Sequence, residues 1–188
     1  MRRSSSSEFT FRQVDPACPE VRAILLRHLE FCVSVTPPGK VHALGPAALK
    51  APGIAVFGAY VNGTLVGIAA LRRLAADQVE LKSMHTISPH RCRGVGAALL
   101  TYLLGQAAGR GYRRISLETG TYEAFQPARR LYEKFGFREC APFGEHAPNR
   151  ESVCLTREIR SAVAARPGKT PGRRAAASPR SPGCGRQR

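Results

Sequence analysis

The chain has 188 residues, of which 43% are hydrophobic, and it carries a formal net charge of +16 at pH 7. This length suits one domain with a tail, and the apolar fraction is ordinary for a soluble globular protein. No apolar run approaches the ~20 residues that span a bilayer, and the first residues lack the apolar stretch of a secretory signal. We therefore expect a cytoplasmic protein that does not enter a membrane.

The six cysteines form no C-x-x-C pair and no zinc-site spacing, so we expect reduced thiols and no bound metal. The positive charge is concentrated at the end of the chain. From Arg160 onward there are eight Lys or Arg residues and no acidic residue, in a segment rich in Pro, Gly, Ser and Ala. We predict a flexible N-terminus over 1–8, one folded domain over 9–159 and a disordered basic tail over 160–188.

The first half of the domain begins with a strand and a helix. Residues 9–15 alternate apolar and polar side chains, which predicts a strand, and the apolar spacing over 18–35 predicts a helix. A Pro- and Gly-rich loop over 36–53 follows, with at most one short helix. Two β-rich runs then flank Asn62-Gly63, the pair preferred in a type I′ hairpin turn.

The second half alternates strands and helices. The predicted elements are a strand over 79–87, a helix over 94–108, a strand over 113–120, a helix over 127–135 and two pairing strands over 137–143 and 152–159. This order predicts an α/β (α+β layered) fold, with a mixed central β-sheet flanked by helices.

The turn between the strand over 79–87 and the next helix reads Arg91-Cys92-Arg93-Gly94-Val95-Gly96. Glycine weakens a helix interior by about 1 kcal/mol relative to alanine, so two glycines here indicate a need for bare backbone. The first N–H groups of a helix have no internal partner and, with the helix dipole, attract anions. The turn therefore predicts a pyrophosphate cradle, with a purely steric role for the glycines as the alternative.

This turn resembles the R/Q-x-x-G-x-G/A signature of the GNAT superfamily of acyl-CoA-dependent N-acetyltransferases. Downstream, PARRLYEKFGF is similar to that family's A-x-x-L-Y-x-x-x-G-F helix and turn. The resemblance covers 9–159 and points to small bacterial stand-alone acetyltransferases. It implies a single GNAT-like domain with a splayed pair of parallel strands. It also implies direct transfer of an acetyl group from acetyl-CoA to an amine of a small molecule or peptide.

The resemblance also implies which residues hold acetyl-CoA. Backbone N–H groups of the turn would bind the pyrophosphate, namely those of Arg93, Gly94, Val95, Gly96 and Ala97. Arg91 would face the phosphates, with a solvated loop as the alternative for both arginines. The side-chain alternation over 79–87 slips at Met84, which indicates a β-bulge or, alternatively, a fully buried strand. At a bulge, Met84 and Thr86 would offer backbone groups to the pantetheine arm.

One position departs from the family pattern. Many members have an asparagine that contacts CoA three residues before the alanine of the last helix. Here Phe125 stands at that position, so we expect Gln126 to replace the contact or the contact to be lost.

Two residues are candidates for the chemistry. Tyr132 stands where related enzymes place a phenol near the thioester sulfur, and a protonated phenol could donate to the leaving thiolate. Its helical spacing with neighbouring apolar residues also suits a core position. Glu80 is the candidate base, with an ion pair to Lys82 or to a nearby arginine as the alternative.

The acceptor side has three further candidates. His85 is a rival base, because the ordinary histidine pKa suits proton transfer near neutral pH. Glu118, at the end of a predicted strand, could bind a cationic substrate or only cap a loop. His42 lies in the Pro- and Gly-rich loop and is expected to line the acceptor side.

Two other functions stay open from the sequence. A GNAT-like domain could bind acyl-CoA as a sensor without transferring the acyl group. The basic tail could give weak, salt-dependent nucleic-acid binding, although no stacking aromatic residues accompany its arginines. Related enzymes are often dimers, and the sequence leaves a homodimer open.

Overall fold

The structure, a computed structural model, describes residues 9–41 and 43–159. The predicted N-terminal segment 1–8, the predicted tail 160–188 and the candidate acceptor residue His42 lie outside the described residues. Within these described ranges, no helix has both the length and the apolar character needed to cross a bilayer.

The elements follow the predicted alternation. In chain order they are β1 (Phe9–Val14), α1 (Pro19–Val35), the 3-10 helix η1 (Ala48–Lys50), β2 (Ile54–Val61), β3 (Thr64–Arg73), β4 (Gln78–Thr86), the 3-10 helix η2 (Ser88–His90), α2 (Val95–Gly109), β5 (Arg114–Gly120), the 3-10 helix η3 (Glu123–Phe125), α3 (Gln126–Lys134), β6 (Arg138–Glu139) and β7 (Ser152–Glu158).

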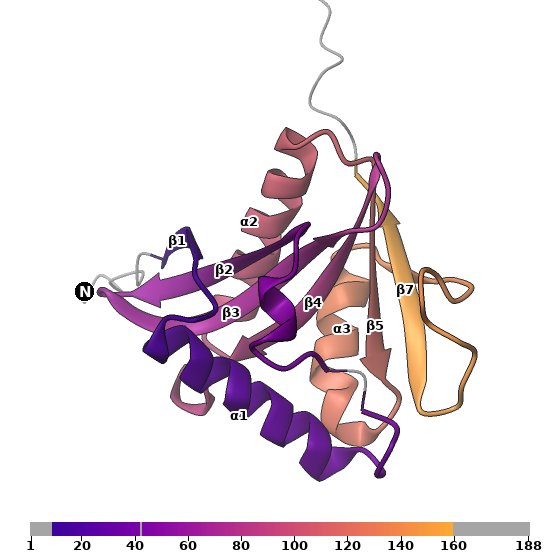
Figure 1. Ribbon diagram of the computed structural model, residues 1–188, viewed down its shortest axis with the longest axis horizontal. Helices are drawn as coiled ribbons and strands as arrows, with labels where there is room; N and C mark the ends of the chain where they lie inside the picture. Colours follow the sequence, from indigo (N-terminus) through magenta and orange to yellow (C-terminus); the bar gives the residue numbers. More distant parts are fainter. Residues whose placement is uncertain (1–8, 42, 160–188) are drawn as a thin grey trace, which may run out of the picture.

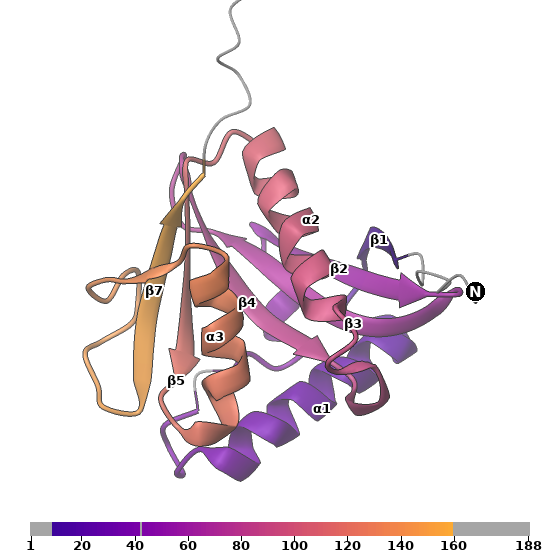
Figure 2. The same cartoon turned by 180° about the vertical axis from the view of Figure 1, so that it is seen from behind.

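Among the described residues, the strands form one seven-stranded sheet in the order β1-β2-β3-β4-β5-β7-β6. The pairing is antiparallel except between β4 and β5, which run parallel. Helix α1 lies on one face of the sheet (Figure 1), and helices α2 and α3 lie on the other (Figure 2). This mixed, three-layered arrangement confirms the predicted fold class.

Each face of the sheet has its own apolar core. On the α2 and α3 face, Leu99, Leu103 and Phe137 are fully buried against strand residues such as Leu81 and Ile115. On the α1 face, a second cluster packs helix residues against β2 and β3. Its helix members are Val21, Ile24 and Leu25, and its strand members include Val56 and Ile68. Alternation of side chains along each strand supplies one residue to each core in turn.

Two turns have the local chemistry that the sequence indicates. Asn62 and Gly63 join β2 to β3 with φ values of 49° and 78°, the left-handed pair of a type I′ turn. At the end of α3, the Phe137 N–H donates to the Tyr132 carbonyl and the Gly136 N–H to that of Glu133. These two bonds form a Schellman cap, and the Phe137 side chain that follows the cap glycine is buried in the core.

Strand β4 contains the predicted bulge. Lys82 pairs with Ala70 and His85 with Ile68, so Ser83 and Met84 together oppose the single residue Ala69. Ser83 has a left-handed φ of 51°, as a local insertion into a ladder requires. The slip in alternation at Met84 is therefore a bulge, and the alternative of a regular buried strand is wrong.

The parallel strands β4 and β5 splay apart. They pair only from Gln78 with Arg114 to Glu80 with Ser116, although both strands continue well beyond those residues. Beyond Glu80, the bulge increases the twist of β4, so that β4 leaves β5. Strand β5 stays paired with β7 along its whole length. The ribbons diverge accordingly (Figure 1), as the family resemblance implies.

One predicted strand is much shorter than expected. The interpretation of 137–143 as a strand holds only for Arg138 and Glu139, which pair with Thr156 and Leu155. Pro142 has no N–H for a ladder, and Gly144 adopts a left-handed φ of 58°. The chain instead forms a loop over 140–151, which crosses the sheet before β7.

Candidate functional site

The start of α2 has the backbone geometry expected of an amide cradle, and the pyrophosphate contact stays a prediction. Cys92 and Gly94 have left-handed φ values of 58° and 83°, and the helix begins at Val95. The Ala98 N–H donates to the Gly94 carbonyl at 2.9 Å, which is the first hydrogen bond of the helix. The N–H groups of Val95, Gly96 and Ala97 come before it and have no acceptor within the helix. Free N–H groups beside exposed arginines suit a bound anion.

Three parts of the protein meet beside this cradle. A Cβ atom built on Gly96 would lie 3.6 Å from the Met84 methyl carbon and 3.4 Å from a Leu131 methyl carbon. The Tyr132 hydroxyl in turn contacts the Met84 sulfur at 3.8 Å. The start of α2, the bulge of β4 and helix α3 therefore converge on Met84, with two motifs from different parts of the sequence brought together.

Tyr132 has the core position that its helical spacing suggested, and its role as the acid stays a prediction. Its ring is buried and packs against Phe137 with centroids 5.7 Å apart. The residue also lines a cavity. Burial raises the pKa of the Tyr132 phenol above its ordinary value, so the hydroxyl keeps its proton at neutral pH.

The cavity lies between α1, the bulged part of β4, β5 and the start of α3. One wall is formed by rings: His28, Phe31, His85 and Phe125. The Phe31 and Phe125 centroids are 5.5 Å apart, and those of His28 and His85 are 5.4 Å apart. The polar lining includes Lys40, Lys82, Ser83, Glu118, Glu151 and Ser152.

The two cavity histidines are uncharged at neutral pH. Burial lowers the pKa of His85 to about 4, assisted by repulsion from Arg91 and Arg27. Burial also lowers the pKa of His28 to about 4, assisted by His85 itself. A neutral imidazole with so low a pKa is a weak proton acceptor, which disfavours His85 as the rival base.

Ser83 adds a polar group at the bulge. Its hydroxyl is buried and, among the described residues, finds no hydrogen-bond partner. A buried polar group without a partner is unfavourable in the folded protein. Because Ser83 lines the cavity, a bound molecule could supply the missing bond.

Glu80 does not line the cavity. Its side chain is fully buried, and three side chains hold it: Arg72 Nε at 2.8 Å, Lys82 Nζ at 2.9 Å and His146 Nε2 at 2.7 Å. Burial alone would raise its pKa, but the three partners outweigh burial and lower it. The alternative interpretation of Glu80 as an ion-pair residue is therefore the one that the structure shows, and this placement disfavours Glu80 as a direct base.

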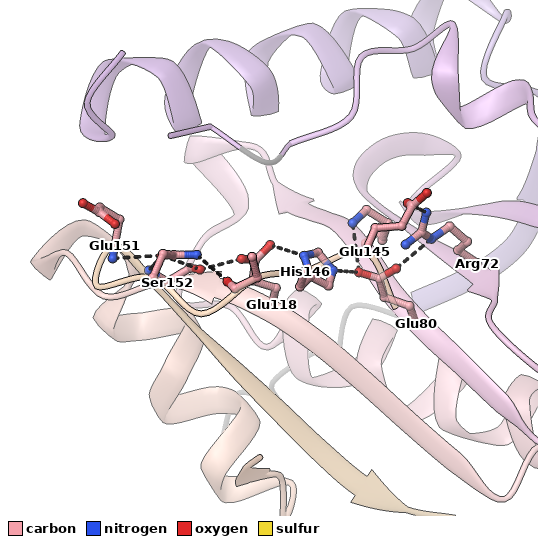
Figure 3. A network of polar contacts seen from close by, with 10 residues as sticks. Arg72, Glu80, Glu118, Glu145, His146, Glu151 and Ser152 are labelled. Carbon is pink, nitrogen blue, oxygen red and sulfur yellow. Dashed lines mark hydrogen bonds and ion pairs between the residues drawn. The ribbon is translucent and has the colours of Figure 1, made fainter. Parts of the chain in front are cut away.

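His146 links this buried cluster to the cavity. Its Nδ1 lies 2.9 Å from Glu118 Oε2, while its Nε2 contacts Glu80 (Figure 3). Glu118 also accepts a hydrogen bond from the Ser152 hydroxyl. No sequence motif marks His146, because its partners lie on other strands far away in the chain.

The other predicted site residues are dispersed around the cradle. Arg91 is exposed, donates from Nε to the Thr86 carbonyl at 3.1 Å and lies over the Phe31 ring. This bond uses one of the five N–H donors of the guanidinium, and the phosphate contact of Arg91 stays a prediction. Arg93 is exposed at the cradle and Gln126 is exposed at the first position of α3; their contacts with CoA stay predictions.

The described residues contain no group of three or more His, Cys, Asp or Glu side chains arranged to hold a metal ion. The five cysteines within them are free thiols, and Cys92 at the cradle is the exposed one.

The fold and the turn at the start of α2 are those expected of an acyl-CoA-dependent transferase, and comparison with known proteins shows the family. Residues 20–137 match the acetyltransferase (GNAT) family, so the chain belongs to this family. The uncharacterized N-acetyltransferase YsnE of Bacillus subtilis (strain 168) is 38% identical over 140 residues, covering 74% of this chain and 93% of YsnE. The uncharacterized N-acetyltransferase YedL of Escherichia coli (strain K12) is 36% identical over 150 residues, covering 79% of this chain and 94% of YedL.

A solved structure gives the same fold. The GNAT family acetyltransferase from Elizabethkingia anophelis, crystallised with acetyl-CoA bound, superposes with a TM-score of 0.60 at 19% identity, covering 80% of this chain and 98% of its own. Family membership and the two bacterial relatives show that the chain is an N-acetyltransferase.

Proposed function

We propose that this protein transfers an acetyl group from acetyl-CoA directly to an amine of a small molecule or peptide. The observation that carries the proposal is the meeting of the amide cradle, the bulge of β4 and the Tyr132 hydroxyl around Met84. A diphosphate at the cradle and a thioester at the bulge would place the sulfur near Tyr132, which agrees with the order of groups along a CoA molecule.

Each step of the reaction uses a different group of the site. The amine nitrogen attacks the thioester carbonyl carbon, and the carbon–sulfur bond breaks. The Tyr132 hydroxyl, held protonated by burial, donates its proton to the departing sulfur. Backbone N–H groups at the bulge lie where they could stabilise the negative charge on the carbonyl oxygen, as preorganised donors do.

The amine arrives as an ammonium ion and must lose a proton before it can attack. We propose that Glu118, which lines the cavity, binds this cation. Glu80 does not line the cavity and is not proposed for this role. Glu118 would then take the proton directly or through water. The ring wall formed by His28, Phe31, His85 and Phe125 would contact the apolar part of the acceptor.

The test is thiol release from acetyl-CoA in the presence of a panel of primary amines, amino acids and short peptides. We expect turnover with at least one class of amine, and a Glu118→Gln variant that loses efficiency for that amine while it still binds acetyl-CoA. CoA binding without turnover on any amine would favour the acyl-CoA sensor instead. Full activity in Glu118→Gln would remove Glu118 from the mechanism.

A further inference from the structure

Residue His146 lies on the loop over 140–151, between β6 and β7. Both of its ring nitrogens face carboxylates, Nε2 toward Glu80 at 2.7 Å and Nδ1 toward Glu118 at 2.9 Å (Figure 3). Its side chain is only 7% exposed, and that of Glu118 is 6% exposed. A single ring thus bridges β4 and β5 at the end of their paired segment, from Glu80, the last residue of β4 that pairs with β5, to Glu118 on β5.

The bridge requires a defined number of hydrogens on the imidazole ring. An ionised carboxylate only accepts hydrogen bonds, so each contact needs a hydrogen on the facing ring nitrogen. A neutral imidazole carries one such hydrogen and the imidazolium carries two. The bridge is therefore complete only when both nitrogens of His146 are protonated.

The Glu80 end of the bridge is rigid. Arg72 and Glu80 are register partners across β3 and β4, and Lys82 lies on the same face two residues further along. Arg72 Nε and Lys82 Nζ hold the two oxygens of Glu80 from opposite sides. The Glu80 carboxylate is thus held in one position. His146, which is bonded to it, can in turn hold the Glu118 carboxylate in position.

The loop itself is fastened at His146 and on its N-terminal side. The Cys140 N–H donates to the Cys154 carbonyl, and the His146 N–H donates to the Phe143 carbonyl, each at 3.0 Å. The Phe143 ring packs edge-on against the imidazole, with centroids 5.0 Å apart. The position of the ring is therefore set by its own loop as well as by the two carboxylates.

We propose that His146 is a positioning residue for acetyl transfer, holding the Glu118 carboxylate toward the acceptor amine by donating one N–H to Glu118 and the other to Glu80. This inference rests on the proposed function of Glu118. It gives the buried Glu80 a role in the reaction through His146 and Glu118, without contact to the substrate.

Charged and titratable groups surround the ring on every neighbouring strand. They are Arg72 on β3, Glu80 and Lys82 on β4, Glu118 on β5, Cys154 on β7 and Glu145 on the same loop. Burial raises the pKa of Cys154 to about 11, so its thiol stays neutral in the working range.

The kinetic experiment compares wild type, His146→Gln and the matched control Glu145→Gln, with an amine that wild type acetylates. Glu145 is the sequence neighbour, its side chain is 85% exposed and its recorded ion pair goes to Arg72 alone. We expect His146→Gln to lower kcat/KM for the amine about 10- to 100-fold, since small misplacements of reacting groups cost this much. The KM for acetyl-CoA should stay within about twofold, and Glu145→Gln should match wild type.

The pH profile separates positioning from a purely structural role. The pH profiles of kcat/KM for wild type and His146→Gln should differ in shape, because only wild type has a ring that can donate hydrogens to both carboxylates. Superimposable profiles for the folded variant and wild type would overturn the inference and leave the proposed function intact. Absence of transfer to any amine by wild type would instead overturn the proposed function.

A spectroscopic measurement on wild type keeps the inference testable if His146→Gln does not fold. The ¹⁵N signals of the His146 ring, assigned through bonds to its backbone, should show both nitrogens carrying hydrogen at the pH of the kinetic assay. A nitrogen without hydrogen under those conditions would contradict the double donation and overturn the proposal.

Discussion

The Tyr132 hydroxyl lies 3.8 Å from the Met84 sulfur, and so at the point where β4 bulges away from the regular ladder. The two residues are separated by α2, β5 and most of α3 in the chain. Their contact places a buried, protonated phenol beside the backbone that the pantetheine arm is expected to follow.

Replacement of Tyr132 by Phe tests its role as the acid. The ring and its packing on Phe137 stay, so the fold and the binding of acetyl-CoA should change little. Loss of the proton donor should lower kcat by roughly 10²- to 10⁴-fold. The measurement is steady-state thiol release, with KM for acetyl-CoA as the second readout.

Tyr102→Phe is the matched control for this variant. Its ring stacks on Phe11 at 4.9 Å, and Tyr102 is not among the residues that line the cavity. The control should keep wild-type kcat. If Tyr132→Phe does so too, the leaving thiolate takes its proton from water and Tyr132 is a core residue only.

Replacement of Glu80 by Gln should destabilise the protein. The change leaves Arg72 and Lys82 with a neutral amide in place of their shared carboxylate, and breaking a buried ion pair typically costs about 3–5 kcal/mol. Denaturant unfolding at pH 7 measures the loss. An unchanged unfolding free energy would show that the three contacts contribute nothing net.

The pH dependence of stability provides a second test of Glu80. Its folded pKa is lowered from an ordinary value of 4.5, so its stabilising contribution is complete above about pH 4.5. The contribution is lost as the pH falls through the lower, folded pKa. The unfolding free energy of Glu80→Gln should therefore fall less steeply below pH 4.5 than that of wild type.

The cavity histidines should make the fold weaken in mild acid. His28 and His85 both have a folded pKa of about 4, against an ordinary value of 6.5. Between these two values the unfolded chain binds protons that the folded protein does not, so stability falls as the pH is lowered from 6.5 to 4. NMR titration of the two rings provides the direct measurement. Midpoints near 6.5 would contradict their burial as neutral groups.

The sequence predicted the parts of the site that are built from neighbouring residues. The cradle at Gly94 and Gly96, the hairpin at Asn62 and Gly63 and the end of α3 at Gly136 each depend on backbone conformations that one or two residues dictate. The bulge of β4 was also predicted, because a slip in side-chain alternation is visible within a single strand.

The sequence could not predict the parts that depend on distant pairing. Glu80 was predicted as the base, with an ion pair as the alternative, and its burial arises only when Arg72, Lys82 and His146 pack around it. His146 lies in the loop over 140–151, the first residues of which were predicted to belong to a strand over 137–143. Neither of its carboxylate partners is near it in the chain. The ring of His28 faces His85 only because α1 packs over the end of β4.

The central claim concerns the amide cradle at the start of α2. Gly96→Asp would place a carboxylate at the second residue of the helix, next to Met84 and Leu131, where a diphosphate is expected. Gly105→Asp, on an exposed position of the same helix with open space around it, is the control of equal charge.

Calorimetric titration with acetyl-CoA is the most direct measurement of this claim. We predict saturable binding by wild type and by Gly105→Asp, and no measurable binding by folded Gly96→Asp. Wild-type protein that releases no heat with acetyl-CoA or CoA, or Gly96→Asp that binds as tightly as wild type, would contradict the cradle.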